Sequence, residues 1–439
     1  MKIAVVSAAV LLLGRAFLSG EPSPPAEALP AAPAGMVSLP GGAYQPLYAK
    51  AATSRKVPAS FLSTLPVTNG QFLDFVRAHP EWRRSQVLPE RADQNYLRHW
   101  AGDLDLGPQA EQLKDAPVTA VSWFATRAFC EARGQRLPTQ DEWEFAARAD
   151  ATRIDASTDQ IFLGKLLEWY SKPNPAVLPS VHAAEPNVYG LRGLHGLVWE
   201  WVYDFNSTMI LGDSRGDDSL ERQLFCGSGS LLAGDVSNYA AFMRYAFRSS
   251  LKGNYCVGSL GFRTAQSIHP EAAVGPVSAI PYAHTSRWRT QENREVTLGS
   301  LGGKVRVITM GFTSCRYACS RIVSDLHRIE LALGTDAGRI GIVFASIDPE
   351  ADTPEAMAAF AAERNLSPER WTFLTGEEGG IRDLAVALAF KYQRVDQEFS
   401  HSNLIGVLDA KGNLVHREER LGADITPTVE AIKKLLANP

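Results

Sequence analysis

The chain has 439 residues, a formal net charge of -4 and 45% hydrophobic residues. This length is enough for two or three domains, each with its own core. The small, balanced charge gives no electrostatic footprint for nucleic acid or an anionic membrane surface. Five cysteines are too few for a scaffold built on disulfide bonds.

The N-terminal region has the pattern of an export signal. Lys2 precedes an apolar run over residues 3–13, and the small, proline-rich stretch GEPSPPAEALPAAPAG follows. This pattern predicts a signal peptide over residues 1–20 and a tether over residues 21–35. The run is too short to span a bilayer as a standard helix. We therefore expect a periplasmic or otherwise exported protein with no stable membrane span once the signal is removed. The alternative is an uncleaved N-terminal anchor.

Composition divides the remainder into two domains and predicts a two-domain α+β protein. Residues 36–265 hold seven of the nine tryptophans and few long periodic helices, which indicates a loop-rich α+β domain. Residues 266–290 contain three prolines and no sustained periodicity, so we expect a linker there. In residues 291–439 strands and helices alternate, which predicts a central sheet with helices on its faces.

The expected elements of the second domain follow in chain order. Apolar runs predict strands over residues 305–312, 340–347, 404–408 and 414–416. Apolar residues at helical intervals predict helices over residues 320–333, 353–365 and 381–390, and from residue 426 onward. Two of these helices have proline at the first helical position, where its missing N–H does no harm.

Two cysteines lie where the first of these strands turns into a helix. Cys315 and Cys319 stand in the stretch VITMGFTSCRYACS, with Thr313 and Ser314 able to cap the helix. Residues i and i+4 share a helix face, so both sulfurs can converge on one point. A helix N-terminus stabilises thiolate, the form that binds metal or attacks a disulfide. The alternative of two small core residues is disfavoured at such a position. The distant segment FSHSNL adds one imidazole, that of His401.

Three motifs of the second domain resemble those of the Sco (Sco/SenC) family of thioredoxin-fold copper chaperones. They are GFTSCRYACS, IDPEADTPEAM and HSNLIGVLDAKGNLV, in the family's order, and the resemblance covers about residues 291–436. It implies that Cys315, Cys319 and His401 bind one copper ion, with Asp348 near the site. The chemistry agrees, because two thiolates suit Cu(I) and an added imidazole lets the site also hold Cu(II).

Some residues of the second domain depart from this pattern or have a second interpretation. Ser320 stands where the family usually has proline, and Ser400 stands where it has aspartate before the histidine. Neither change removes a ligand. Asp348 has an equally good interpretation as a residue that shapes the loop before the helix. His327 is expected to be a surface or packing residue.

The first domain resembles the formylglycine-generating enzyme (sulfatase-modifying factor) family, which has a variant of the C-type lectin-like fold and includes NirV-like accessory proteins. Its most specific strings are RLPTQDEWE and VWEWVYD. On physical grounds these are framework: we expect the large aromatic residues to fill the core and the charged ones to form buried ion pairs. The aromatic residues are Trp143, Trp199 and Trp201, and the charged ones are Arg136, Glu142, Glu144 and Glu200.

The cysteines of the first domain argue against catalysis of the formylglycine type. In the oxidase members two cysteines bind Cu(I), but the matching segment here, SLLAGDVSNYAAFMRYAFR, contains none. Cys226 precedes this segment and Cys256 follows it. These two could form a disulfide in an oxidising compartment, the alternative being two buried thiols. Cys130 is expected in the core. An oxidase of the formylglycine-generating type is therefore the least favoured function.

The sequence also argues against a calcium site in the first domain. Leu197 stands where the family has an oxygen-bearing asparagine, and calcium requires oxygen ligands. Asn187 and Glu200 remain, which is too few to predict a site.

Two classes of function follow from the sequence. The first is an exported copper chaperone that delivers the metal to a cuproenzyme, either a copper nitrite reductase or a cytochrome oxidase, while the first domain recognises that client. The second is a thiol-disulfide oxidoreductase, in which Cys315 and Cys319 reduce the cysteines of a client's copper site. His401 discriminates between them, since a chaperone needs this ligand and a reductase does not. The sequence assigns no catalytic residue beyond these redox-active candidates.

Overall fold

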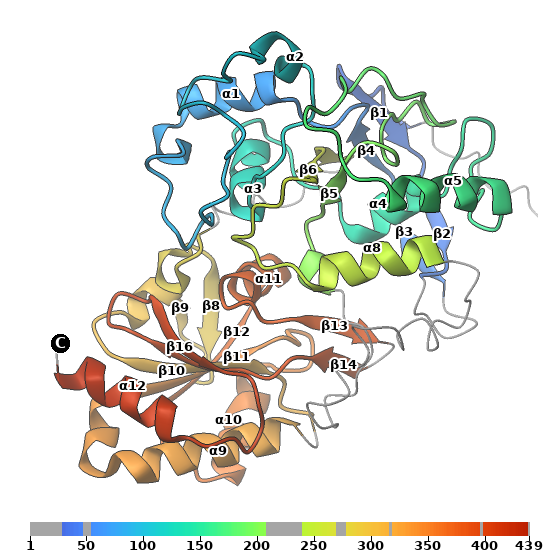
Figure 1. Cartoon of the computed structure of the whole chain (residues 1–439). Coiled ribbons are helices and arrows are strands. Elements are labelled where there is room, and N and C mark those ends of the chain that lie inside the picture. The colour runs from blue at the N-terminus through green and yellow to red at the C-terminus, as the bar shows by residue number, and fades with distance from the viewer. Residues whose placement is uncertain are drawn as a thin grey trace, which may run out of the picture.

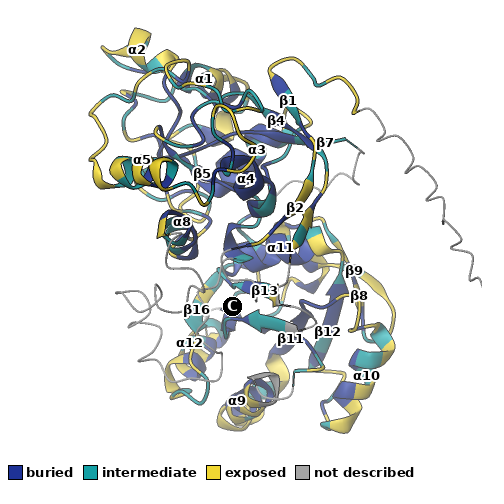
Figure 2. Ribbon diagram, turned by 90° about the vertical axis from the view of Figure 1, so that its right-hand side faces the viewer, coloured by how far each residue is buried: buried dark blue, intermediate teal, exposed yellow. Residues whose placement is uncertain are grey.

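The computed structural model describes residues 29–46, 54–207, 239–268, 278–315, 318–395 and 398–437; the side chains of residues 318–320, 395 and 398 are not described. The predicted signal peptide and Cys226 lie outside these ranges. Figure 1 shows two domains that follow one another along the chain and pack together, and Figure 2 shows buried residues filling the interior of each. In the described part, no helix is both long and apolar enough to cross a membrane.

The first domain combines three small sheets with helices that surround them. Its strands are β1 (Met36–Leu39), β2 (Gly42–Tyr44), β3 (Arg55–Val57), β4 (Ser60–Ser63), β5 (Trp199–Trp201), β6 (Leu260–Phe262) and β7 (Ala265–Ser267). Its described helices are α1 (Asn69–Ala78), α2 (Ala110–Lys114), α3 (Trp123–Glu131), α4 (Gln140–Ala147), α5 (Gln160–Ser171) and α8 (Tyr239–Ser249). The strands pair in the orders β1-β4-β7, β2-β3 and β5-β6.

The string RLPTQDEWE forms the start of α4, and its residues have the structural role that the sequence predicted. Thr139 caps the helix by accepting the Glu142 N–H, and the Glu142 carboxylate accepts the Thr139 N–H at 2.8 Å. Arg136 donates to both oxygens of Glu142, at 2.6 and 2.7 Å. The capping box thus satisfies the N–H groups of Thr139 and Glu142 with side chains, and the ion pair with Arg136 holds the Glu142 carboxylate in place.

The expected buried ion pairs are present in the core of the first domain. Glu200 accepts from Arg263 at 2.7 Å, with both side chains fully buried, and from the Trp143 indole at 2.7 Å. Burial alone would raise the pKa of the Glu144 carboxyl, but Arg244 and Arg248 outweigh that effect and lower this pKa to about 2. These contacts satisfy charges that would otherwise be costly to bury.

The aromatic residues of this framework do not all fill the core. Trp143 and Trp201 are buried as expected. Trp199 is only half-buried, since its ring lies at the edge of the domain against Tyr170 and Phe247, with ring centroids 4.8 and 4.9 Å apart.

The second domain is a seven-stranded sheet with helices on both faces. Its strands are β8 (Arg287–Thr290), β9 (Glu295–Thr297), β10 (Arg306–Gly311), β11 (Gly341–Ser346), β12 (Trp371–Gly376), β15 (Ile405–Leu408) and β16 (Leu414–Glu418), in the order β16-β15-β10-β11-β12-β8-β9. Strands β10, β11 and β12 are parallel, and β15 and β8 pair antiparallel with them. A separate hairpin joins β13 (Tyr392–Val395) to β14 (Glu398–His401).

Alternation along the strands gives the sheet two cores. Phe344 belongs to the core beneath α9 (Ala318–Leu333), α10 (Pro354–Glu363) and α12 (Thr426–Ala437), and its neighbour Val343 belongs to the core beneath α11 (Glu378–Ala387). Successive residues of a strand point to opposite faces, so a strand that is buried on both faces has a continuous run of apolar residues. Figure 1 places α11 on the side of the sheet that faces the first domain.

Most predicted elements of the second domain form, with two differences. The linker expected over residues 266–290 is shorter, because its ends are strand residues: Gln266 and Ser267 belong to β7, and 287–290 form β8. The helix expected over residues 381–390 runs instead over Glu378–Ala387. It ends early because Ala389 adopts a left-handed conformation, with φ 48°.

Candidate metal centre

Cys315 lies just after the central strand β10, where the two cores of the second domain meet. Its side chain is half-buried and packs against apolar residues of both cores. Its N–H donates to the carbonyl of Phe312 at 3.2 Å, so Cys315 belongs to a turn. Cys319 lies in the described backbone of α9, although its side chain is outside the described residues. The shared helix face that we expected is therefore not the arrangement, because Cys315 precedes the helix.

The loop before Cys315 is held by a buried carboxylate. Asp352 is fully buried and accepts hydrogen bonds from the N–H and hydroxyl groups of Thr313, and from the Ser346 hydroxyl at 2.6 Å. Thr313, expected as a helix cap, thus joins the cysteine loop to the segment after β11. Asp348 accepts the Ala351 N–H at 3.3 Å and so shapes this segment, which is the second interpretation considered above.

His401 is a buried histidine with one unused ring nitrogen. Only 1% of it is exposed, and its Nδ1 lies 2.7 Å from the carbonyl oxygen of Ser402. A carbonyl only accepts, so Nδ1 carries the proton and Nε2 presents its lone pair. Nε2 is buried and has no hydrogen-bond partner. A neutral imidazole oriented through Nδ1–H to a backbone carbonyl is the form in which histidine binds metals.

Phe312 connects the histidine to the cysteine turn. Its ring meets the His401 imidazole edge to face, with ring centroids 5.7 Å apart, and its carbonyl accepts the Cys315 N–H. On its other side His401 stacks on Phe390, with centroids 5.6 Å apart. Cys315 and His401 are 86 positions apart in sequence and both contact one residue, Phe312, the first through its backbone carbonyl and the second through its ring. His327 is removed from this group on α9, where it is partly exposed and contacts Glu330.

The donor set is consistent with a copper ion held by Cys315, Cys319 and His401. The buried, unpartnered Nε2 of His401 is a nitrogen donor without another use, and the half-buried Cys315 lies in the adjoining turn. Among the residues that the structure describes, no three histidine, cysteine, aspartate or glutamate side chains form a metal-binding group. That search does not include the side chain of Cys319.

The described cysteines of the first domain are inert by comparison. Cys130 is a fully buried free thiol in α3, as expected, and Cys256 is a free thiol that is 3% exposed. Burial raises the pKa of both thiols well above the ordinary value. Reactive cysteines instead have lowered pKa values and access to solvent. The oxygen of Asn187 accepts two backbone N–H groups, so this residue has a structural use within the domain.

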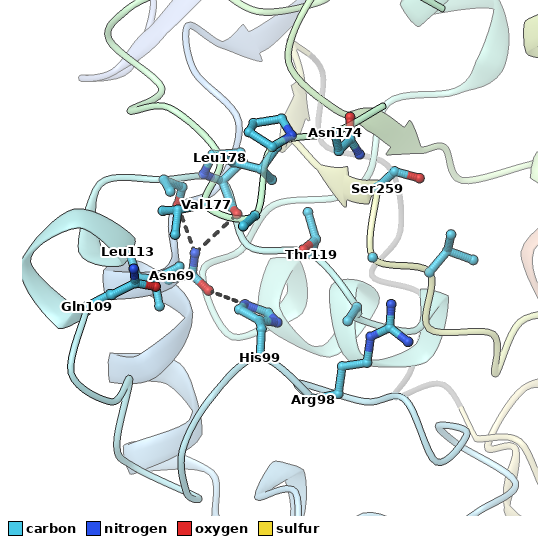
Figure 3. A pocket seen from close by; sticks show the side chains of 17 residues that line it. Asn69, Arg98, His99, Gln109, Leu113, Thr119, Asn174, Val177, Leu178 and Ser259 are labelled. Atoms are coloured by element: carbon cyan, nitrogen blue, oxygen red, sulfur yellow. Dashed lines mark hydrogen bonds between the residues drawn. The ribbon is translucent and has the colours of Figure 1, made fainter. Parts of the chain in front are cut away.

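A cavity of about 520 Å³ opens in the first domain among α1, α2 and the loop before β6 (Figure 3). Arg98, Asn174, Thr119 and Ser259 contribute polar groups to its lining. His99 also lines it and contacts the Asn69 side-chain oxygen at 2.9 Å, and burial lowers the pKa of His99 to about 4. The sequence did not single out this cavity, because its lining comes from five separate segments of the chain.

The two folds correspond to a C-type lectin-like domain followed by a thioredoxin-like domain. Residues 22–268 match the family model described as a sulfatase-modifying factor enzyme 1-like domain, and residues 283–437 match the SCO1/SenC model. The chain belongs to the sulfatase-modifying factor enzyme 1-like family, whose model covers more than half of it, and carries a SCO1/SenC domain at its C-terminal end. Both resemblances inferred from the motifs are confirmed.

Curated relatives match one domain or the other. The inactive C-alpha-formylglycine-generating enzyme 2 of Mus musculus is 30% identical over 178 residues, which cover 32% of this chain and 56% of that protein. The formylglycine-generating enzyme of Streptomyces coelicolor is 34% identical, covering 34% of this chain and 52% of that protein. The SCO1 protein homolog of Bacillus subtilis is 33% identical, and the match covers 26% of this chain and 63% of that protein. The chain thus spans just over half the length of these first-domain relatives.

Solved structures match the second domain. Bradyrhizobium japonicum ScoI with copper bound is 25% identical, with a TM-score of 0.30, and the match covers 35% of this chain and 97% of that one. Yeast Sco1 with copper bound is 19% identical, with a TM-score of 0.31, and the match covers 35% of this chain and 87% of that one.

Sequence reasoning missed the residues that surround the candidate ligands. Phe312 and Phe390 enclose the His401 ring, Ser402 fixes its tautomer, and Asp352 holds the cysteine loop. The only available sequence indication was that Phe312 and Asp352 stand within the motifs that carried the resemblance.

Proposed function

We propose that this protein is an exported copper chaperone that holds one copper ion through Cys315, Cys319 and His401. The observation that carries the proposal is the Nε2 of His401, a buried lone pair without a partner next to the turn of Cys315. The match of residues 283–437 to the SCO1/SenC family supports the same ligand set.

The chemistry of the three donors suits a carrier. Two thiolates satisfy Cu(I), and the imidazole adds the borderline ligand that Cu(II) prefers. Deprotonation of the thiols accompanies metal binding, so the affinity rises with pH. The Ser402 carbonyl keeps the proton of His401 on Nδ1 and leaves Nε2 free for the metal.

The client in this proposal is an exported cuproenzyme, and the first domain is the module that recognises it. The cavity lined by Arg98 and Ser259 offers that domain a place to hold a segment of a client. A copper nitrite reductase and a cytochrome oxidase remain the two candidates. Incubation of the copper-loaded protein with each purified apoenzyme, followed by the client's own activity, decides between them.

A second candidate function rests on the partial exposure of Cys315, since a residue that attacks a client disulfide must not be fully buried. In that reaction one thiolate attacks a client sulfur, and the second displaces the client thiol from the mixed disulfide. Cys315 and Cys319 lose two electrons and two protons to form a disulfide, and the client disulfide gains both pairs. His401 takes no part in this reaction.

Copper affinities of the full chain test the proposal. We expect Cys315→Ser and Cys319→Ser each to weaken Cu(I) binding on the order of 100-fold, measured by competition with a chromophoric chelator, because each removes one soft ligand. His401→Ala should weaken Cu(II) binding chiefly. Cys256→Ser is the matched control, since it removes a buried thiol elsewhere.

The two functions give opposite patterns in these variants. Copper binding that survives the loss of either Cys315 or Cys319 would rule out the chaperone. If His401→Ala leaves Cu(II) binding intact while the protein reduces a model disulfide efficiently, the oxidoreductase is the better description.

A further inference from the structure

The turn between α11 and β13, residues 388–391, surrounds the candidate ligand His401. The Phe390 side chain is fully buried and stacks on the His401 imidazole. The Lys391 N–H donates to the Ser402 hydroxyl oxygen at 3.0 Å, and the Lys391 carbonyl accepts the Ser402 N–H at 2.8 Å. Because the Ser402 carbonyl accepts from His401 Nδ1, this turn supports both the ring and its hydrogen-bond partner.

The first domain reaches the same turn with two contacts. Asn206, which is 3% exposed, donates from Nδ2 to the Phe390 carbonyl at 3.2 Å, and its Oδ1 accepts from Arg382 at 3.4 Å. The Lys391 ammonium donates to the carbonyl of Ser249, at the end of α8. Residues of two different domains therefore meet at the segment that pairs with the His401 strand.

The turn needs these contacts because its backbone is strained. Ala389 has φ 48°, a left-handed conformation that costs a residue with a side chain about 1 kcal/mol. The second domain fixes part of the turn, since Arg417 donates to the carbonyls of Leu388 and Ala389. The next carbonyl, that of Phe390, is held by Asn206 from the first domain.

From these contacts we infer that Asn206, together with the Ser249 carbonyl, positions the copper ligand His401 from the first domain. The inference rests on the proposed function, in which His401 binds copper. A ligand whose ring is held before the metal arrives loses less conformational freedom on binding, so support outside the ligand set raises affinity. The first domain is thereby a structural part of the metal centre as well as a candidate client module.

Cu(II) affinity of the full chain is the measurement that isolates this role. Asn206→Ala should weaken Cu(II) binding about fivefold, the effect of losing one hydrogen bond, and change the electron paramagnetic resonance parameters of bound Cu(II). Cu(I) affinity should stay within about twofold, because the two thiolates dominate it. Lys391→Met removes the other contact and should act in the same direction.

Two further variants show which bond matters. Asn206→Asp keeps an acceptor for Arg382 but lacks the donor to the Phe390 carbonyl, so it should resemble Asn206→Ala. Asn69→Ala is the matched control. Asn69 is also fully buried and donates to two backbone carbonyls, of Ala116 and Pro117, but all its partners lie in the first domain. Equal Cu(II) affinities in Asn206→Ala and Asn69→Ala would overturn the inference.

His401→Ala separates this inference from the proposed function. If that variant binds Cu(II) like the parent, His401 is not a ligand, and the proposed function and the positioning role both fail. If it loses Cu(II) while Asn206→Ala and Lys391→Met bind like the parent, only the positioning role fails.

Discussion

Arg127 of the first domain and Asp383 of the second form an ion pair, with Nη1 and Oδ1 3.1 Å apart and both side chains 4% exposed. The Arg127 guanidinium also lies over the Tyr203 ring, 4.9 Å from its centroid, and pairs with Glu131. Charges buried this deeply in a contact between domains favour one fixed orientation, because any displacement leaves a charge unpaired in a dry environment. The contacts of Asn206 and Lys391 depend on that orientation.

Removing one partner of this pair should be costly. Arg127→Ala leaves the Asp383 carboxylate buried without its partner, and we expect the free energy of unfolding in urea to fall by about 3 kcal/mol. Arg77→Ala, which breaks a pair with the exposed Asp74, should cost less than about 1 kcal/mol. The double variant Arg127→Met, Asp383→Leu should recover most of the loss. Equal costs for Arg127→Ala and Arg77→Ala would contradict a structural role for the pair.

His284, beside this interface, should make stability depend on pH. Burial lowers its pKa to about 4 from the ordinary 6.5, and Arg127 contributes in the same direction. Between pH 6.5 and 4, His284 is therefore protonated in the unfolded chain and neutral in the folded chain. The stabilisation is full above pH 6.5 and is lost as the pH falls toward 4, by up to about 1.4 kcal/mol per pH unit for this group.

Urea unfolding of the parent and of His284→Gln at pH 7, 6 and 5 checks this expectation. The free energy of unfolding of the variant should fall less between pH 7 and 5 than that of the parent, because the variant lacks the titrating imidazole. The gap in free energy of unfolding between the two proteins should therefore narrow at low pH. A difference that is constant across this range would show that His284 does not titrate as its burial indicates.

The helix cap at the start of α4 offers a test of the first-domain framework. Thr139→Ala removes the hydroxyl that accepts the Glu142 N–H, and we expect a loss of about 1 kcal/mol in the free energy of unfolding. Thr139→Ser keeps that oxygen and should retain most of the stability. If Ser and Ala are equally destabilising, the methyl group rather than the cap is responsible.

Local features of this fold were predictable from the sequence, and contacts between distant residues were not. Thr353 and Pro354 predicted the start of α10, and Thr353 does accept the Ala356 N–H as a cap. Glu200 was predicted to pair, but its partner Arg263 is 63 residues away, and several arginines were equally suitable. A cap depends on neighbouring residues, whereas an ion pair depends on where the whole chain places them.

The candidate metal centre shows the same division. The spacing and motifs predicted Cys315, Cys319 and His401 as ligands, and that set stays a prediction. The aromatic rings that enclose His401 come from segments 78 residues apart, at Phe312 and Phe390. The bond between Asn206 and Phe390 spans 184 residues and two domains. No periodicity or motif records such a contact, because it follows from the way the domains pack.

Asp352 provides a prediction about the cysteine loop itself. Its carboxylate accepts from the Thr313 N–H and hydroxyl and from Ser346, and burial raises its pKa. Asp352→Asn replaces one acceptor oxygen with a donor, so the Thr313 N–H or the new amide loses its partner. We expect a loss of about 2 kcal/mol in the free energy of unfolding. We also expect faster alkylation of Cys315, because the loop that precedes it is released.

Peptide mapping after timed iodoacetamide treatment of the metal-free full chain measures that rate. Asp424→Asn is the matched control, because Asp424 also accepts from a threonine N–H and hydroxyl, those of Thr426 at the start of α12. Its contacts lie away from the cysteine turn, so Cys315 should be alkylated at the parent's rate. If the two variants give the same rate, the Asp352 carboxylate does not restrain the loop, and the position of Cys315 depends on its apolar contacts with the two cores.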